Sequence, residues 1–112
     1  MIRSKHPVIA TVPVTDLMAA MRFYQEQLGL AVCDQNPDRR QVIFEAGNGS
    51  HFLLYESPIP PSSDATVLNF LVNDLESTMD DLRRQGIPFE EYDLPHVKTR
   101  KGISETDGER VA

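Results

Sequence analysis

Residues 11–17 read Thr-Val-Pro-Val-Thr-Asp-Leu, and residues 69–75 read Asn-Phe-Leu-Val-Asn-Asp-Leu. Both stretches contain the pattern Val-x-Asp-Leu, and each is followed by an amphipathic segment that ends near a glycine, Gly29 in the first copy and Gly86 in the second. A supersecondary unit that is repeated along a chain is typical of folds built from similar modules. The repeat therefore predicts two related halves.

The segment between these landmarks is predicted to be a helix in each half. Asp16 and Asp74 are suitable N-caps, and Gly29 and Gly86 are suitable C-terminal stops, where a positive φ is needed. Pro88 blocks any continuation of the second helix. Apolar residues recur at helical spacing along the first segment, at Leu17, Ala20, Met21, Tyr24 and Leu28.

Runs of β-branched and aromatic residues predict the strands around these helices. In the first half the expected strands cover residues 7–14, 31–34, 41–45 and 51–56, with a hairpin at Gly47-Asn48-Gly49. In the second half they cover residues 66–72 and 89–92, followed by a polar loop through Gly102 and a turn at Asp107-Gly108.

Alternation along the predicted strands separates two faces. One face is apolar throughout and suits helix packing: Val8, Ala10, Val12, Val14, Phe52, Leu54, Leu68, Phe70 and Val72. The other face mixes apolar bulk with a few hydrogen-bonding groups, as ligand pockets do. Its expected hydrogen-bonding residues are Thr11, His51, Tyr55 and Asn69. Its expected apolar walls are Ile9, Leu53, Val67 and Leu71. The alternative is that the polar groups satisfy one another or ordered water, and that His51 is a partly exposed strand-end histidine.

Length and composition predict one domain over residues 1–112, with a first module at 6–57, a Pro-rich linker at 58–65 and a second module at 66–112.

The formal net charge of −6 argues against a nucleic-acid partner. Cys33 is the only cysteine, so no internal disulfide can form. No apolar run approaches membrane-spanning length, and the cytoplasm is the expected location.

The motifs Val12-Pro-Val14-Thr-Asp16-Leu17 and Leu28-Gly29-Leu30, with their second-half counterparts, resemble the vicinal-oxygen-chelate superfamily of glyoxalases, bleomycin resistance proteins and extradiol dioxygenases. The resemblance implies an α+β fold in which two β-α-β-β-β modules form a curled mixed sheet around a cavity, commonly in a homodimer. The sequence ends at Ala112, where relatives continue with a hairpin and a final strand, so the last strand of the second module is expected to be missing. Either the chain is truncated, or a neighbouring edge strand is left open for a partner subunit to cover.

The resemblance also bears on metal binding. Metal-using members usually place donors at positions that correspond here to Ile9, Leu53 and Val67, none of which can bind a divalent ion. His6, His51 and His96 share no recognised ligand spacing. We therefore expect neither a metal nor another cofactor.

Three functions follow as hypotheses, and whether the protein is an enzyme stays open. The first is metal-free binding of a small organic molecule in the cavity, as drug-sequestering resistance proteins of the superfamily do. The second is a metal-dependent lyase, isomerase or dioxygenase, with ligands from elsewhere such as His51 and Glu56. The third is a non-catalytic interaction module that assembles through its open edge, which also favours a homodimer.

Overall fold

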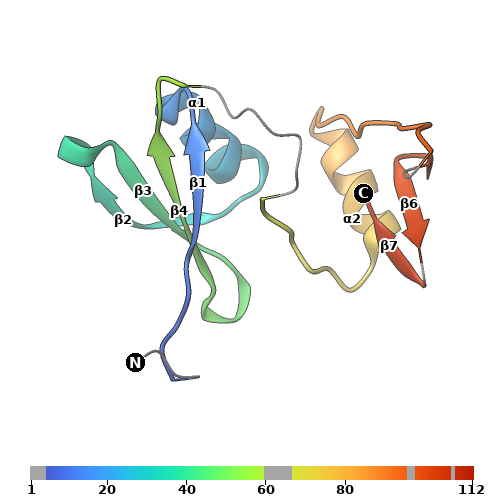
Figure 1. Ribbon diagram of the computed structural model, residues 1–112, viewed down its shortest axis with the longest axis horizontal. Coiled ribbons are helices and arrows are strands. Elements are labelled where there is room, and N and C mark those ends of the chain that lie inside the picture. The colour runs from blue at the N-terminus through green and yellow to red at the C-terminus, as the bar shows by residue number, and fades with distance from the viewer. Residues whose placement is uncertain (1–4, 60–66, 96–97, 107) are drawn as a thin grey trace. The chain divides into compact units, whose positions relative to one another are not determined.

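The computed structural model describes residues 5–59, 67–95, 98–106 and 108–112. The chain divides into two compact units, Met1–Asn69 and Phe70–Ala112. Figure 1 shows the first unit in blue to green and the second in yellow to red. The mixed α+β character predicted from the sequence is confirmed. The organisation as a single domain with a linker stays a prediction.

The first unit is one complete β-α-β-β-β module, as predicted (Figure 1). The sheet has the order β1-β4-β3-β2, in which β1 runs parallel to β4 and the other pairs are antiparallel. Short 3-10 turns join β2 to β3 and β3 to β4. Its elements are β1 (Ala10–Val14), α1 (Leu17–Arg22), the π-helical turn η1 (Phe23–Gln27), β2 (Ala31–Asn36), β3 (Gln41–Glu45) and β4 (His51–Glu56).

The predicted helix boundaries are confirmed at both ends. The carboxylates of Asp16 and Asp74 each accept a hydrogen bond from the backbone N–H three residues later, at 3.1 and 3.0 Å. These bonds satisfy donors that would otherwise lack a partner in the first turn. Gly29 and Gly86 have φ values of 73° and 85°, which a residue with a Cβ rarely adopts.

The core of the first unit lies between the sheet and the helix that runs from α1 into η1. Tyr24 brings its ring over Phe44 and Phe52, with centroid distances of 5.6 and 5.1 Å. Burial of Tyr24 raises the pKa of its phenol. Val12, Phe52 and Leu54 are buried, as predicted for the helix-packing face, whereas Val8 is 90% exposed and precedes β1, and Ala10 is exposed, so these two predictions are wrong. The buried residues of this core are Val12, Val42, Phe44, Phe52 and Leu54.

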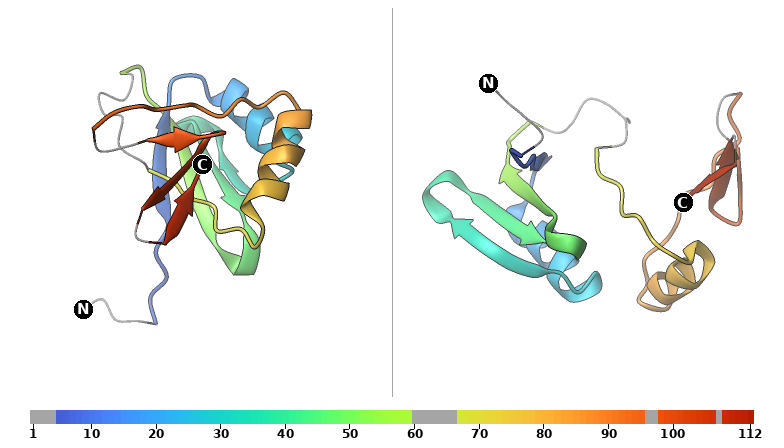
Figure 2. Two further views of the ribbon diagram at one scale, coloured as in Figure 1. Left: turned by 90° about the vertical axis from the view of Figure 1, so that its right-hand side faces the viewer. Right: turned by 90° about the horizontal axis from the view of Figure 1, so that it is seen from below.

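The second unit consists of α2 (Leu75–Arg84) and an antiparallel sheet of β5 (Thr99–Arg100), β6 (Ile103–Thr106) and β7 (Glu109–Val111), in the order β5-β6-β7 (Figure 2). Met79 of α2 is 1% exposed and forms its centre. A Cβ at Gly102 would lie 3.0 Å from the Phe89 Cβ and 3.1 Å from the Met79 Cε, so a larger residue would force these neighbours to shift, and the φ of 81° also favours glycine. Within the described part of the chain, no helix is both long and apolar enough to cross a membrane.

The strand predicted over residues 66–72 is wrong for its described part, because residues 67–72 form no strand. A strand needs a partner in a sheet, and β1, at the corresponding place in the first module, pairs with β4. Neither of the described sheets includes residues 67–72, and apolar alternation alone does not make a strand.

The second half differs from expectation at two further places. Residues 89–92 form no strand. The Tyr92 carbonyl accepts a hydrogen bond from the Thr99 N–H at 2.8 Å, but the Tyr92 N–H donates to the Thr99 side chain, and Asp93 makes one isolated bridge to Lys98. The expected polar loop through Gly102 instead contains the β5–β6 hairpin. Thr66, His96 and Asp107 lie outside the described residues, as does most of the linker.

Replacing Leu54 with alanine tests this account of the core. Leu54 is 0% exposed, so Leu54→Ala should lower the free energy of unfolding by about 2–5 kcal/mol through lost transfer energy and the cavity left behind. Leu71→Ala is the matched control, because Leu71 is 98% exposed, and we expect a change within about 0.5 kcal/mol. Urea denaturation followed by circular dichroism measures both. Equal losses would contradict the core assignment.

Candidate functional site

The candidate site is the face of the four-stranded sheet that lies opposite the core. Because successive side chains of a strand point to opposite faces, the residues between the buried ones share this second face. We call it the site face. It comprises Thr11, Pro13, Gln41, Ile43, Glu45, His51, Leu53 and Tyr55.

The register of the sheet fixes the order of these side chains across the site face. Thr11 pairs with Leu53, and Leu53 pairs with Ile43, so a hydroxyl lies beside two aliphatic side chains in the central row. His51 pairs with Glu45 at one end of the sheet. Leu53 and His51 are half-buried, whereas Thr11 and Glu45 are exposed. The face therefore offers an aliphatic centre with polar groups around it.

Three residues of β3 belong to this face but were not among the sequence candidates: Gln41, Ile43 and Glu45. Tyr55 lies between Pro13 and Gln41 in the row next to the centre. The signal was present in the sequence, because a hairpin at residues 47–49 sets the register of the strands on either side of it. Applying that register to the β4 candidates would have identified their β3 neighbours.

Half of the predicted site residues come together in the structure. Thr11, His51, Leu53 and Tyr55 share the site face through the β1–β4 ladder. The other four lie outside the strands, and their roles in a site stay predictions. Ile9, 44% exposed, directly precedes β1; Val67, 65% exposed, and exposed Asn69 end the first unit; Leu71 belongs to the second unit.

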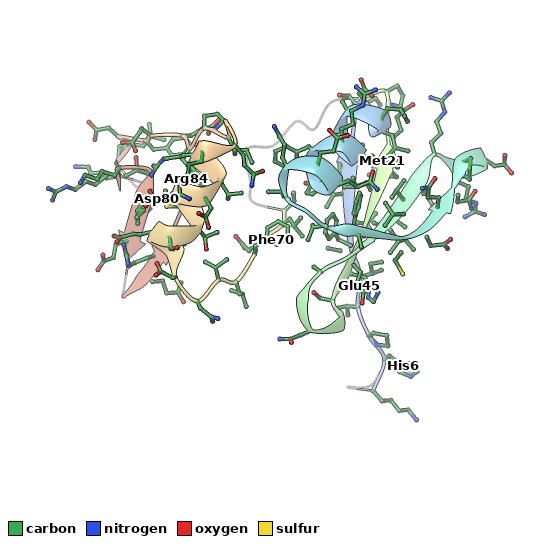
Figure 3. All side chains as sticks on the ribbon, turned by 180° about the vertical axis from the view of Figure 1, so that it is seen from behind. His6, Met21, Glu45, Phe70, Asp80 and Arg84 are labelled. Carbon is green, nitrogen blue, oxygen red and sulfur yellow. The ribbon has the colours of Figure 1, made fainter. Side chains whose placement is uncertain are left out.

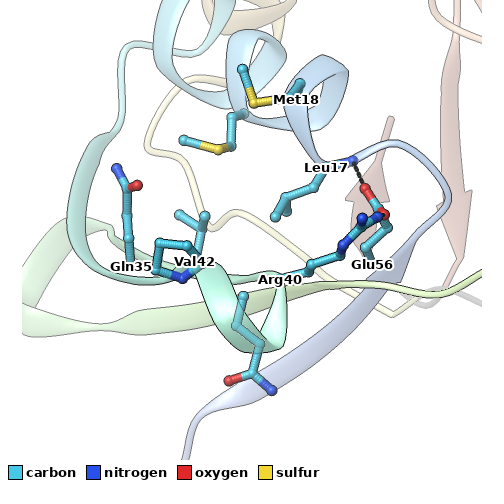
Figure 4. A pocket seen from close by; sticks show the side chains of 9 residues that line it. Leu17, Met18, Gln35, Arg40, Val42 and Glu56 are labelled. Carbon is cyan, nitrogen blue, oxygen red and sulfur yellow. Dashed lines mark hydrogen bonds and ion pairs between the residues drawn. The ribbon is translucent and has the colours of Figure 1, made fainter.

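Glu56, at the end of β4, points to the opposite face and connects the helix to the sheet (Figure 4). Its Oε2 accepts a hydrogen bond from the Leu17 backbone N–H at 3.1 Å, and its Oε1 forms an ion pair with Arg40. The pKa of Glu56 is lowered mainly by the hydrogen bond from the Leu17 backbone N–H, and next by the hydrogen bond from Arg40. The hypothetical metal ligand pair of His51 and Glu56 is therefore wrong, because the two side chains lie on different faces.

A shallow cavity of about 350 Å³ lies beside Glu56 on the helix side of the sheet (Figure 4). Met18 and Met21 of the helix and Val42 of β3 give it an apolar lining. Its two charged residues, Arg40 and Glu56, are paired with each other. Met21 lies on this helix side of the sheet, whereas Glu45 lies on the site face (Figure 3). The cavity thus offers apolar contact without an unpaired charge.

The residues of the site face do not fit a divalent metal. Among the described residues, no three His, Cys, Asp or Glu side chains gather into a set that would hold an ion. Leu53 occupies the centre of the site face, and its aliphatic side chain supplies no N, O or S donor. Ile9 and Val67 likewise carry no donor. The site face therefore presents no set of side chains through which a divalent metal would act.

A β-α-β-β-β module with its helix on one sheet face, in a chain that repeats the opening motif, defines the class of paired-module vicinal-oxygen-chelate folds. Residues 5–112 match the Glyoxalase/Bleomycin resistance protein/Dioxygenase superfamily, and the chain belongs to it. The resemblance stated from the sequence motifs is thus confirmed.

Solved structures share this fold at low sequence identity. An integron cassette protein from the mobile metagenome of a Halifax Harbour sewage outfall has a TM-score of 0.61 and 20% identity, covering 73% of this chain and 72% of its own. Lactoylglutathione lyase from Agrobacterium tumefaciens has a TM-score of 0.56 and 18% identity, covering 91% and 84%. An antibiotic-binding protein from Streptomyces sp. CB03234 has a TM-score of 0.57 and 17% identity, covering 95% and 92%. A search of curated proteins gives no match.

The Glu56 contacts predict a pH dependence of stability. Because the pKa of Glu56 is lowered in the folded state, its carboxylate stabilises the fold at neutral pH, and this contribution is lost as the pH falls through the folded pKa. Glu56→Gln should lower the melting temperature at neutral pH, with a difference from wild type that shrinks toward strongly acidic pH. Glu45→Gln, on the site face, is the matched control. A pH-independent difference at Glu56 would contradict the assignment.

Proposed function

We propose that this protein binds a small organic molecule against the site face without using a metal. The observation that carries the proposal is the position of Leu53, an aliphatic side chain at the centre of the face, paired with Thr11 on one side and Ile43 on the other. Metal-using members of the superfamily commonly place a donor near this position, whereas leucine favours an apolar ligand surface. No cofactor enters the proposal.

The side chains of the site face suggest the chemical character of the ligand. An apolar, flat body would contact Leu53 and Ile43, while hydrogen-bonding groups at its periphery would meet Thr11, Tyr55 and His51. Such a mixture of apolar contact and a few polar groups is typical of small-molecule sites. The antibiotic-binding Streptomyces protein, which has the same fold, supports this class of ligand.

The proposal includes the remaining residues expected from the sequence. Asn69 would add a hydrogen-bonding group, and Ile9, Val67 and Leu71 would supply the apolar wall of the ligand cavity expected from the sequence. We further propose that the protein works in the cytoplasm as a homodimer. A lyase, isomerase or dioxygenase is the rival function, and it would need a metal.

Substitutions that remove single hydroxyl groups test the ligand surface. A panel of small aromatic molecules is screened by NMR with ¹⁵N-labelled protein, and bound compounds should shift the amides of β1, β3 and β4. Thr11→Val and Tyr55→Phe should each weaken such a compound roughly three- to tenfold, since each removes one hydrogen bond while keeping the shape. Tyr92→Phe, outside the site face, should leave affinity unchanged. Shifts confined to other residues would refute the proposal.

Metal titration separates the proposal from its enzymatic rival. Protein purified without chelator is offered zinc, nickel, manganese and ferrous ions and then analysed for metal per chain. We expect uptake far below one ion per chain, because the site face lacks a donor set. One tightly held ion per chain that is lost in His51→Ala would instead establish a metal site and replace the binding proposal with the rival.

A further inference from the structure

A cleft of about 500 Å³ lies within the second unit, next to one face of the β5–β6–β7 sheet. In the ladder, Arg100 pairs with Ile103, and Glu105 pairs with Arg110, so these four side chains share that face. Lys98, two residues before Arg100, follows the same alternation. All five line the cleft, together with Glu76 of α2.

The charges around this cleft do not balance. Glu76 Oε1 accepts a hydrogen bond from Arg110 Nη2 at 2.7 Å, and Glu105 lies opposite Arg110 in the strand register. The other cations, Lys98, Arg100 and Lys101, form no ion pair with any described residue. A chain with a formal net charge of −6 thus concentrates positive charge at one cleft.

The turn that carries these cations is held in place by the rest of the second unit. Lys101 has a φ of 54° and Gly102 a φ of 81°, so the β5–β6 turn is tight. Arg83 Nη2 donates a hydrogen bond to the Lys101 carbonyl at 2.8 Å. This contact fixes the backbone of the turn from α2, so less backbone entropy is lost when a ligand binds the cations that the turn carries.

We propose that this cleft binds a small, multiply charged oxyanion, such as a phosphate monoester or a polycarboxylate. Lys98, Arg100 and Lys101 would hold its oxygens by charge-assisted hydrogen bonds, and Ile103 would contact an apolar part of the same molecule. The site lies in the second unit and uses no residue of the site face. It is therefore independent of the function proposed above.

Titration of the full ¹⁵N-labelled chain with inorganic phosphate, at constant ionic strength set with sodium chloride, tests the proposal. Saturating amide shifts are expected in β5–β7. Arg100→Ala should weaken phosphate binding about fivefold, the effect of one unit charge at contact distance in water. Arg39→Ala, which removes an exposed cation in the first unit, is the matched control and should change nothing. Equal effects of the two substitutions, or shifts that do not saturate, would overturn the proposal.

Glu105→Gln is expected to have the opposite effect to Arg100→Ala, and it tests whether Arg100→Ala weakens binding only by disturbing the local structure. It removes a negative charge from the cleft, so phosphate should bind about fivefold more tightly. Weaker binding in Glu105→Gln would overturn the proposal. A parallel titration with citrate distinguishes the two sources of the anion: tighter citrate binding supports a polycarboxylate ligand, and tighter phosphate binding supports a phosphate ester.

Discussion

The parallel pairing of β1 with β4 is the constraint on which the rest of the first module depends. Parallel strands cannot be joined by a tight turn, so the chain must cross over before it returns to pair with β1. Here the crossover carries α1 and the β2–β3 hairpin, and the ladder places Val12 beside Leu54 and Thr11 beside Leu53. One set of backbone hydrogen bonds therefore aligns the core row and the site row together.

The same constraint accounts for the unequal halves of the structure. The helix of the second half forms as expected, because its cap at Asp74 and its stop at Gly86 are local features. A strand at residues 67–72 needs a distant partner, as β1 needs β4, and residues 67–72 form no strand in the described part of the chain. Local signals thus suffice for α2, whereas a strand depends on what another part of the chain supplies.

This difference also explains how much of the site could be predicted from the sequence. The two-residue alternation placed Thr11, Leu53 and Tyr55 on one face without knowledge of their neighbours. It did not assign Ile43, whose place follows only once the hairpin register is applied. The role of Glu56 could not be predicted, since it depends on contacts with Leu17 and Arg40, which are distant in sequence.

The residues on one face of β4 stabilise the fold, whereas those on its other face form the candidate site. Phe52 and Leu54 lie in the core, and Glu56 ties the sheet to the start of α1, so these positions are bound by packing and hydrogen bonding. Leu53 contributes nothing to that core, because its side chain points to the other face. Either a metal-binding side chain or an aliphatic one at position 53 is therefore compatible with the same fold. Membership of the superfamily consequently does not bring metal chemistry with it, and the character of the site rests on the side chains that this chain presents.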